Sequence, residues 1–169
     1  SQHAGAVSPT GDMSKLIDEL RISTGENISI ARAHKLAGGG TTMFGQYVHQ
    51  DGKTGVLIQC EGSVSQDLAK DICMHITAAV PRPQGVDRSS VPASVIDRER
   101  RLAIEMAVES GKTPEIAEKM VEGKINKLYS DLALVEQDFV RDPTKKIKDL
   151  LPAGASITAF LRWQVGEEA

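Results

Sequence analysis

The chain has 169 residues, 40% of them hydrophobic, which is enough for one domain with a buried core and excludes wholesale disorder. Aromatic residues make up only 4% and the net charge is −3, which argues against a protein that binds single-stranded nucleic acid or a phosphate backbone. No apolar run approaches the roughly 20 residues of a membrane span, and no signal peptide opens the sequence. The two cysteines, Cys60 and Cys73, form neither a disulfide framework nor a CxxC site, so a reducing compartment is expected.

The first part of the sequence changes character after about ten residues. Residues 1–11 are small, polar and aperiodic, which predicts a disordered leader or linker before a core domain over residues 12–169. The missing initial methionine suggests that a longer parent chain was cut or processed. Apolar residues at helical spacing predict a short amphipathic helix over residues 12–21. After a turn, the alternating pattern at residues 28–31 predicts the start of a strand, which the three glycines at 38–40 end.

The next part predicts a β-hairpin followed by a helix. Residues 43–49 and 54–60 have the pattern of two strands. Asp51 and Gly52 lie between them, and this pair tolerates the positive φ that tight hairpin turns require. A helix is then predicted over residues 65–79, because apolar residues recur along one stripe until two prolines end the pattern.

A helical hairpin is predicted over residues 91–128. Its first helix covers residues 91–109, with apolar residues at near-heptad spacing. Thr113 and Pro114 are typical of a helix start, so the second helix is expected to begin there. Gly123 inside this helix costs about 1 kcal/mol relative to alanine, and we expect a close backbone approach to compensate.

The last third contains a short apolar segment at residues 132–135, a loop that ends at Asp142-Pro143 and a small helix to about Leu151. Residues 157–165 then alternate strictly between the two faces of a strand, which is the clearest strand pattern in the sequence. The predicted fold class is therefore α+β: a small antiparallel sheet packed against helices, with an inserted antiparallel coiled-coil helical hairpin.

Catalytic and metal-binding patterns are weak in this sequence. The residues that could in principle hold zinc are His3, His34, His49, His75, Cys60 and Cys73. None of them has HxxxH, CxxC or HExxH spacing, and no GxSxG elbow is present. His75 lies on the apolar stripe of its helix and is interpreted as a core or interface histidine, and the cysteines as small hydrophobic side chains. We therefore predict no metal site, and a small metal hydrolase is kept only as an alternative that stoichiometric zinc would support.

His49 is the polar residue with the most informative surroundings. It is expected at the end of a strand beside a tight turn, next to Tyr47, Gln50 and Asp51. A side chain held there is exposed and rigidly mounted, and tyrosine is enriched at binding hot spots. The residues thus predict either a partner-binding surface or an ordinary hairpin tip.

Several segments of the sequence resemble translation elongation factor Ts. They are GENI at 25–28, GQYVH at 45–49, GVL at 55–57, MHI at 74–76, the long run from 116 to 145, and FLRWQVGE at 160–167. The resemblance keeps this order over residues 25–167 and is carried most strongly by the string EKMVEG followed by EQ, FV and DP.

The resemblance implies a guanine nucleotide exchange factor for elongation factor Tu, without active-site chemistry, catalytic residues or a cofactor of its own. It also implies the sheet, helices and inserted coiled-coil hairpin already expected. Tyr47 and His49 match the family's histidine-bearing segment that contacts elongation factor Tu, and we add the neighbouring Gln46 and Gln50 to the predicted site. The expected location is the cytoplasm, with a mitochondrial or plastid matrix as alternatives; indirect ribosome contact and a homodimer are left open, and direct nucleic-acid or membrane binding is not expected.

Two departures from the family limit this expectation. Members normally begin with a small three-helix, ubiquitin-associated-like domain, whereas residues 12–21 supply at most one helix. The family's TDFV motif, which reaches into the GTPase near its magnesium site, is also missing, because Cys60 is followed by EGSVSQDLAKD. The chain is therefore expected to be the docking half of a two-part core. The alternative is an interaction or scaffold module on elongation factor Tu or the ribosome that does not promote exchange.

Overall fold

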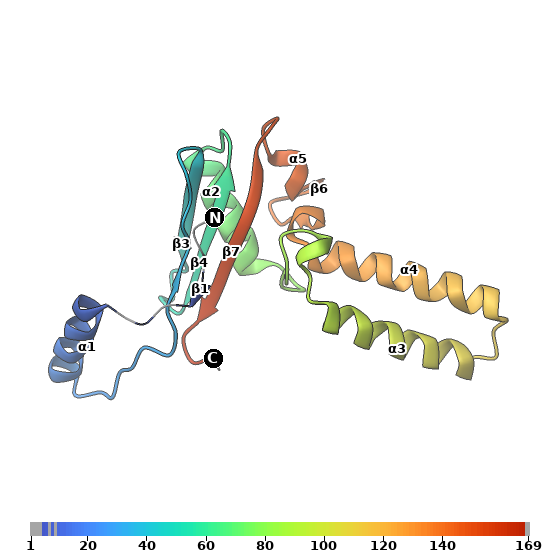
Figure 1. Ribbon diagram of the computed structural model, residues 1–169, viewed down its shortest axis with the longest axis horizontal. Helices are drawn as coiled ribbons and strands as arrows, with labels where there is room; N and C mark the ends of the chain where they lie inside the picture. Colours follow the sequence, from blue (N-terminus) through green and yellow to red (C-terminus); the bar gives the residue numbers. More distant parts are fainter. Residues whose placement is uncertain (1–4, 7, 9, 168–169) are drawn as a thin grey trace. The chain divides into compact units, whose positions relative to one another are not determined.

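The computed structural model describes residues 5–6, 8 and 10–167 (Figure 1). Contacts within the chain divide it into two compact units. The smaller unit contains residues 1–40 and 166–169, and the larger one contains residues 41–165. A division after residue 40 was not among the boundaries expected from the sequence.

The smaller unit contains α1 (Gly11–Thr24) and two short strands, β1 (Gly5–Ala6) and β2 (His34–Lys35), which pair antiparallel. The side chain of Thr10 caps α1 by accepting from the Met13 backbone N–H, and Gly25 ends the helix with a φ of 70°. The predicted helix is confirmed and is three residues longer at its carboxyl end. None of its residues is buried.

The sequence predicts a strand and a disordered leader among the residues of this unit. The strand expected from residue 28 to the glycines at 38–40 is wrong over residues 28–31, where no regular structure forms and the carbonyl of Ile28 accepts a hydrogen bond from the Arg21 side chain. Of that expected strand, only His34–Lys35 is present. The expected disordered leader falls largely on residues 1–4, 7 and 9, which lie outside the described residues. Within the same stretch, Gly5–Ala6 forms a strand.

The larger unit is built around an antiparallel sheet with the strand order β3-β4-β7. Its strands are β3 (Thr42–Val48), β4 (Thr54–Glu61) and β7 (Ser156–Gln164). These elements confirm the three strongest strand predictions to within one residue at each end. Alternate residues of β4 are buried, as a strand with one face against a core requires.

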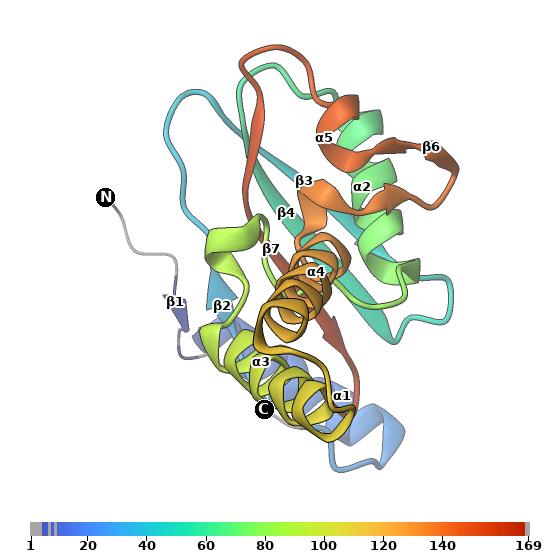
Figure 2. The ribbon, with the colours of Figure 1, turned by 90° about the vertical axis from the view of Figure 1, so that its right-hand side faces the viewer.

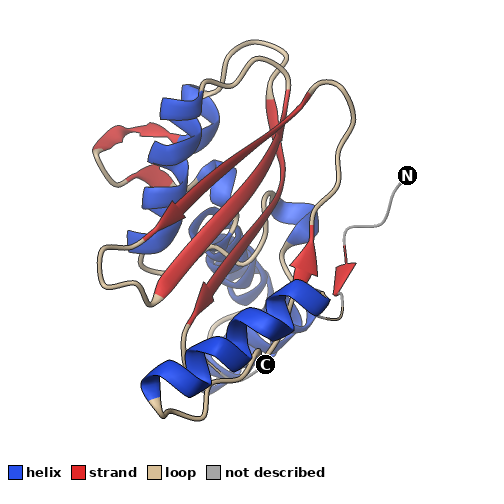
Figure 3. Cartoon of the chain, turned by 90° about the vertical axis from the view of Figure 1, so that its left-hand side faces the viewer, coloured by secondary structure: helices blue, strands red, loops and turns tan. Residues whose placement is uncertain are grey.

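Helix α2 (Gln66–Ala78) packs against one face of this sheet. The side chain of Ser65 caps the helix by accepting from the Leu68 N–H. Close packing explains the glycine in β3, since a Cβ at Gly45 would lie 2.5 Å from the Cβ of Ala69. Figure 2 shows the helices of this unit in front of the strands, and Figure 3, from the opposite side, shows the three long strands in front.

The main core lies between the sheet, α2 and the segments that follow the helical hairpin. Its buried members are Val56, Ile58, Cys60, Val64, Ala69, Ile72, Cys73, Ile76, Leu134, Phe139, Ile147 and Ile157. The predicted burial of both cysteines is thereby confirmed.

The helical hairpin consists of α3 (Ala93–Glu109) and α4 (Pro114–Leu132), preceded by a 3-10 turn, η1 (Arg88–Ser90). Gly111 has a φ of 65° in the connection, and Pro114 opens α4 as predicted, although the Thr113 side chain makes no capping bond. The two helices pack through a second buried cluster that includes Ile96, Ala103 and Val121. Figure 1 shows this hairpin extending away from the strands of the same unit. Its coiled-coil character stays a prediction.

After α4 the chain returns to the sheet through short elements. These are η2 (Leu134–Glu136), β5 (Asp138–Phe139), β6 (Asp142–Lys146) and α5 (Ile147–Leu150). β5 and β6 pair antiparallel, so the loop predicted to end at Asp142-Pro143 is partly a small two-stranded ribbon.

Candidate functional site

Tyr47 and His49 lie next to each other where β3 ends. Strand alternation places both on the face that packs against α2, since Tyr47 is paired with the buried Val56. The Tyr47 hydroxyl and Nδ1 of His49 are 3.2 Å apart, and the two rings meet edge to face at 6.1 Å. Tyr47 is half-buried against the main core, so it holds the imidazole from one side.

The turn that carries His49 is fixed by its own backbone. The His49 N–H donates to the Thr54 carbonyl over 2.8 Å, and the His49 carbonyl accepts from Gly52 over 2.8 Å. Gly52 has a φ of 68°, which few other residues adopt without strain. Asp51 accepts from the Lys53 N–H, which lowers the pKa of its carboxyl group, helped by the nearby charges of His49 and Lys53. His49 is therefore mounted on a rigid turn, as the sequence predicts.

The four predicted contact residues do not share one face. Gln46 is exposed and alternates with Tyr47, so it belongs to the face of the sheet opposite α2. Gln50 is exposed in the turn directly after His49. The structure thus brings Tyr47, His49 and Gln50 together at one end of the sheet and separates Gln46 from them. Their role as partner contacts stays a prediction.

The zinc and nucleophile alternatives find little support. Among the described residues, no group of three or more histidine, cysteine or acidic side chains could hold a metal ion. Cys60 and Cys73 are fully buried, and burial raises the pKa of their thiols to about 11 and about 12. A thiol with such a pKa stays protonated near neutral pH and is a poor nucleophile or ligand. His3 lies outside the described residues.

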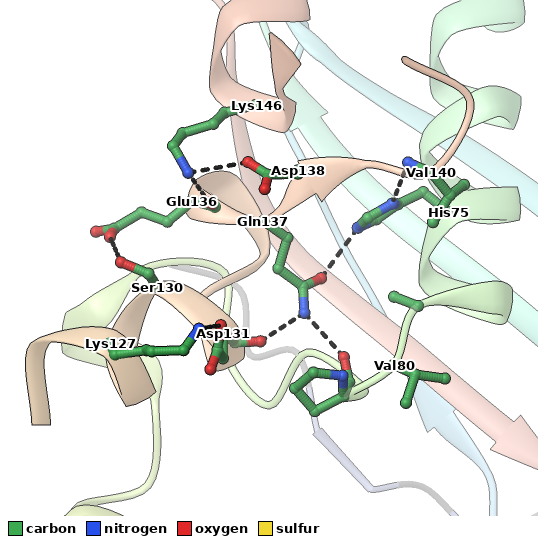
Figure 4. A pocket seen from close by; sticks show the side chains of 12 residues that line it. His75, Val80, Lys127, Ser130, Asp131, Glu136, Gln137, Asp138, Val140 and Lys146 are labelled. Carbon is green, nitrogen blue, oxygen red and sulfur yellow. Dashed lines mark hydrogen bonds and ion pairs between the residues drawn. The ribbon is translucent and has the colours of Figure 1, made fainter. Parts of the chain in front are cut away.

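A second group of polar residues surrounds His75, which is buried with 1% of its surface exposed (Figure 4). Nδ1 of His75 accepts from the Val140 N–H over 3.3 Å, so the ring proton sits on Nε2 and is donated to Oε1 of Gln137 over 3.0 Å. The imidazole is therefore neutral, and burial lowers its pKa although the hydrogen bond to Gln137 acts in the opposite direction. The interpretation of His75 as a core histidine is confirmed.

Gln137 joins two further segments to this histidine. Its side-chain nitrogen donates to the carbonyl of Pro81 over 2.9 Å and to that of Asp131 over 2.6 Å. Figure 4 shows the amide between the end of α4 and the loop after α2. Sequence reasoning missed Gln137, because it lies 62 residues from His75 and no local pattern marks it.

A cavity of about 310 Å³ lies beside this network. The charged side chains at its rim are paired: Lys146 with Asp138 over 3.1 Å, and Lys127 with Asp131 over 3.2 Å. Lys146 also donates to the carbonyl of Glu136. Lys146 thus ties the end of β6 to η2 and β5, whereas Lys127 and Asp131 pair within α4, and we assign the cavity no ligand.

No helix among the described residues is long and apolar enough to cross a bilayer.

The sequence of this chain matches a family of known proteins. The family described as "Elongation factor TS" matches residues 3–167. Proteins named elongation factor Ts are 44% identical over 144 residues in Photorhabdus laumondii and 46% identical over 151 residues in Thioalkalivibrio sulfidiphilus. These matches cover 85% and 88% of this chain, but 48% and 50% of the two relatives.

A third relative, elongation factor Ts of Psychromonas ingrahamii, is 45% identical over 144 residues, which are 85% of this chain and 47% of its own length. The chain therefore spans about half the length of the curated relatives it matches. The family match covers every described residue, including the hairpin turn with His49 and the network around His75. The chain belongs to the elongation factor Ts family.

Proposed function

We propose that this chain binds elongation factor Tu and takes part in nucleotide exchange on that GTPase during translation elongation, in the cytoplasm. The observation that carries the proposal is the family match over residues 3–167, together with relatives named elongation factor Ts. The rigid pair of Tyr47 and His49 supplies a surface that suits this role. An exchange factor of this kind needs no covalent step, so the chain works through its binding surface.

The mechanism we propose is preferential binding. A protein that binds nucleotide-free elongation factor Tu more tightly than its GDP form must weaken GDP binding by the same factor, because the two equilibria are linked. Each tenfold change requires about 1.4 kcal/mol of difference in binding free energy. Fixed side chains favour this use, because little conformational entropy is lost on docking.

Within that mechanism we assign the chain to docking. Tyr47, His49 and Gln50 would form the contact, whereas the TDFV motif is absent from residues 1–169. Where the motif would follow β4, the chain instead turns at Gly62, with a φ of 86°, and enters α2 after Ser65. The disturbance of the magnesium site would then come from a segment other than those described here.

The direct test is release of a fluorescent GDP analogue from elongation factor Tu in the presence of the chain. We expect binding to elongation factor Tu, and we expect His49→Ala to weaken it by about tenfold while the thermal unfolding midpoint stays unchanged. Exposed Lys119 on α4 is a matched control, and Lys119→Ala should bind like the wild type. A His49→Ala variant that binds as tightly as the wild type would rule out the docking role of His49.

A second candidate function is a docking module that binds elongation factor Tu without promoting exchange. The missing TDFV motif favours it for the chain taken alone. The same release experiment separates the two: faster GDP release supports exchange, and binding without acceleration supports docking alone.

A further inference from the structure

The end of the sheet that carries His49 continues across all three strands. The His49 backbone bonds to Thr54 at the start of β4, and Thr54 is paired with Gln164 at the end of β7. By strand alternation, the side chains of Tyr47, Thr54 and Gln164 point to the face covered by α2. Arg82, in the loop after α2, donates from Nη2 to the side-chain oxygen of Gln164 over 3.3 Å.

The direction of α2 explains why Arg82 reaches this place. Ala69 on α2 meets Gly45 on β3, and from there to Ala78 the helix rises by about 13 Å. From Gly45 to His49 the strand also advances by about 13 Å. The loop that follows the helix, residues 79–83, lies at the end of the sheet that carries His49, because Arg82 in this loop bonds to Gln164 at the end of β7.

Arg82 is held by a fixed backbone. It lies between Pro81, whose own φ is fixed, and the buried Pro83, which restricts the Arg82 backbone to extended conformations. The carbonyl of Pro81 accepts from Gln137, and the N–H of Gln84 donates to the carbonyl of Leu132. The backbone on both sides of an exposed arginine is thus anchored to the core, whereas its guanidinium lies at the surface.

The composition of this surface indicates the kind of partner it fits. Arg82 and Lys53 are exposed cations, and Asp51 is the one acid in the turn from His49 to Thr54. Val80, two residues before Arg82, exposes 95% of its surface. Arginine is among the residue types enriched at binding hot spots, and an exposed apolar side chain two residues away adds apolar area to the same loop.

We propose that Arg82 is a preorganised anchor of the elongation factor Tu surface, extending it from Tyr47 and His49 across β7 to the loop after α2. This inference rests on the proposed function above. The matching patch of the partner carries carboxylate or carbonyl oxygens that accept from the guanidinium, beside an apolar side chain that covers Val80. Arginine suits such oxygens because its planar group can donate two parallel hydrogen bonds.

The test is the affinity of the full chain for nucleotide-free elongation factor Tu, measured by calorimetry at about 50 mM and about 300 mM KCl. We expect Arg82→Ala to weaken binding by about tenfold at the lower salt and to make the salt dependence shallower, because a charged contact is lost. Arg98→Ala, which removes an exposed arginine on α3, should change neither quantity.

Gln164→Ala distinguishes contact from internal support, because it removes the same hydrogen bond and leaves the guanidinium in place. We expect its affinity to stay within about twofold of the wild type. The proposal is overturned if Arg82→Ala binds like the wild type, or if Gln164→Ala loses as much affinity with an unchanged salt dependence. A chain that does not bind elongation factor Tu at all overturns this proposal and the proposed function together, whereas a loss confined to His49→Ala overturns only the role of Arg82.

Discussion

Gly45 and Gly123 both lie inside regular elements, but their surroundings differ. A side chain at Gly45 would collide with Ala69 across the helix–sheet contact, whereas a Cβ at Gly123 would meet nothing within 4 Å. The close approach expected at Gly123 is therefore wrong: this glycine lies on an exposed face of α4 and no packing contact requires it.

We predict that Gly123→Ala stabilises the protein by up to about 1 kcal/mol, because alanine restricts the unfolded chain and favours the helix. Urea unfolding followed by circular dichroism measures the change. Gly45→Ala is the paired variant, and we expect it to destabilise the protein by about 1–3 kcal/mol through overpacking. A Gly123→Ala variant less stable than the wild type would show that this glycine has a structural role after all.

The neutral, buried His75 makes stability depend on pH. Its pKa is lowered in the folded protein, so below its ordinary value of about 6.5 the unfolded chain binds more protons than the folded one. Its contribution to stability is therefore fully present above about pH 6.5 and is lost as the pH falls toward the lowered pKa.

We predict that the free energy of unfolding falls between about pH 7 and about pH 5, and that it falls less in His75→Gln. Denaturant unfolding of both proteins across this range gives the two slopes. Glutamine keeps hydrogen-bonding capacity without a titrating ring, so the comparison isolates the imidazole. Equal slopes would show that His75 does not contribute to the acid sensitivity.

At the scale of elements, the base of the helical hairpin is held by Arg88. This arginine, in η1, donates to both carboxylate oxygens of Glu136 over 2.6 and 2.9 Å, and to the side chain of Asn126 over 3.1 Å. It also lies 5.5 Å from the centre of the Tyr129 ring. The hydrogen bond to Arg88 lowers the pKa of Glu136. One side chain thus connects the start of the hairpin to its end.

We predict a coupling of roughly 0.5 kcal/mol between Arg88 and Glu136 in a double-mutant cycle with Arg88→Ala and Glu136→Gln, because both side chains are partly exposed and screened by water. Unfolding in urea at low and high salt gives the coupling and its screening. A coupling free energy of zero at low salt would mean that the buried cluster of the hairpin holds the two helices together without this pair.

The elements best predicted from the sequence are those with long periodic patterns. The alternation before Gln164 and the Ser65 cap were sufficient to place β7 and α2 within one residue. The four-residue alternation at 28–31 was too short, and a side chain took the hydrogen bond a strand would have needed. The pairing of His75 with Gln137, and of Arg82 with Gln164, joins residues far apart in the chain, so only the fold reveals them.

The candidate site was predictable only in part. The hairpin pattern and the Asp-Gly turn were sufficient to predict a turn-mounted His49 next to Tyr47, but not that His49 would be partly buried. Gln46 was grouped with them by proximity in sequence, although alternation turns neighbouring residues of a strand to opposite faces.

At the scale of the molecule, the chain combines a rigid sheet end with a projecting helical hairpin in its larger unit. It matches about half the length of its relatives, and the activity proposed for it rests on the surface around Tyr47 and His49. In the proposed mechanism, the effect of this surface on GDP depends on which form of the GTPase it prefers.

The most direct measurement is calorimetric titration of this chain into elongation factor Tu in its nucleotide-free and GDP-bound forms, under identical salt and magnesium. The preferential-binding account predicts at least about tenfold tighter binding to the nucleotide-free form, equivalent to about 1.4 kcal/mol, and a loss of affinity in His49→Ala. Equal affinity for the two forms would contradict it.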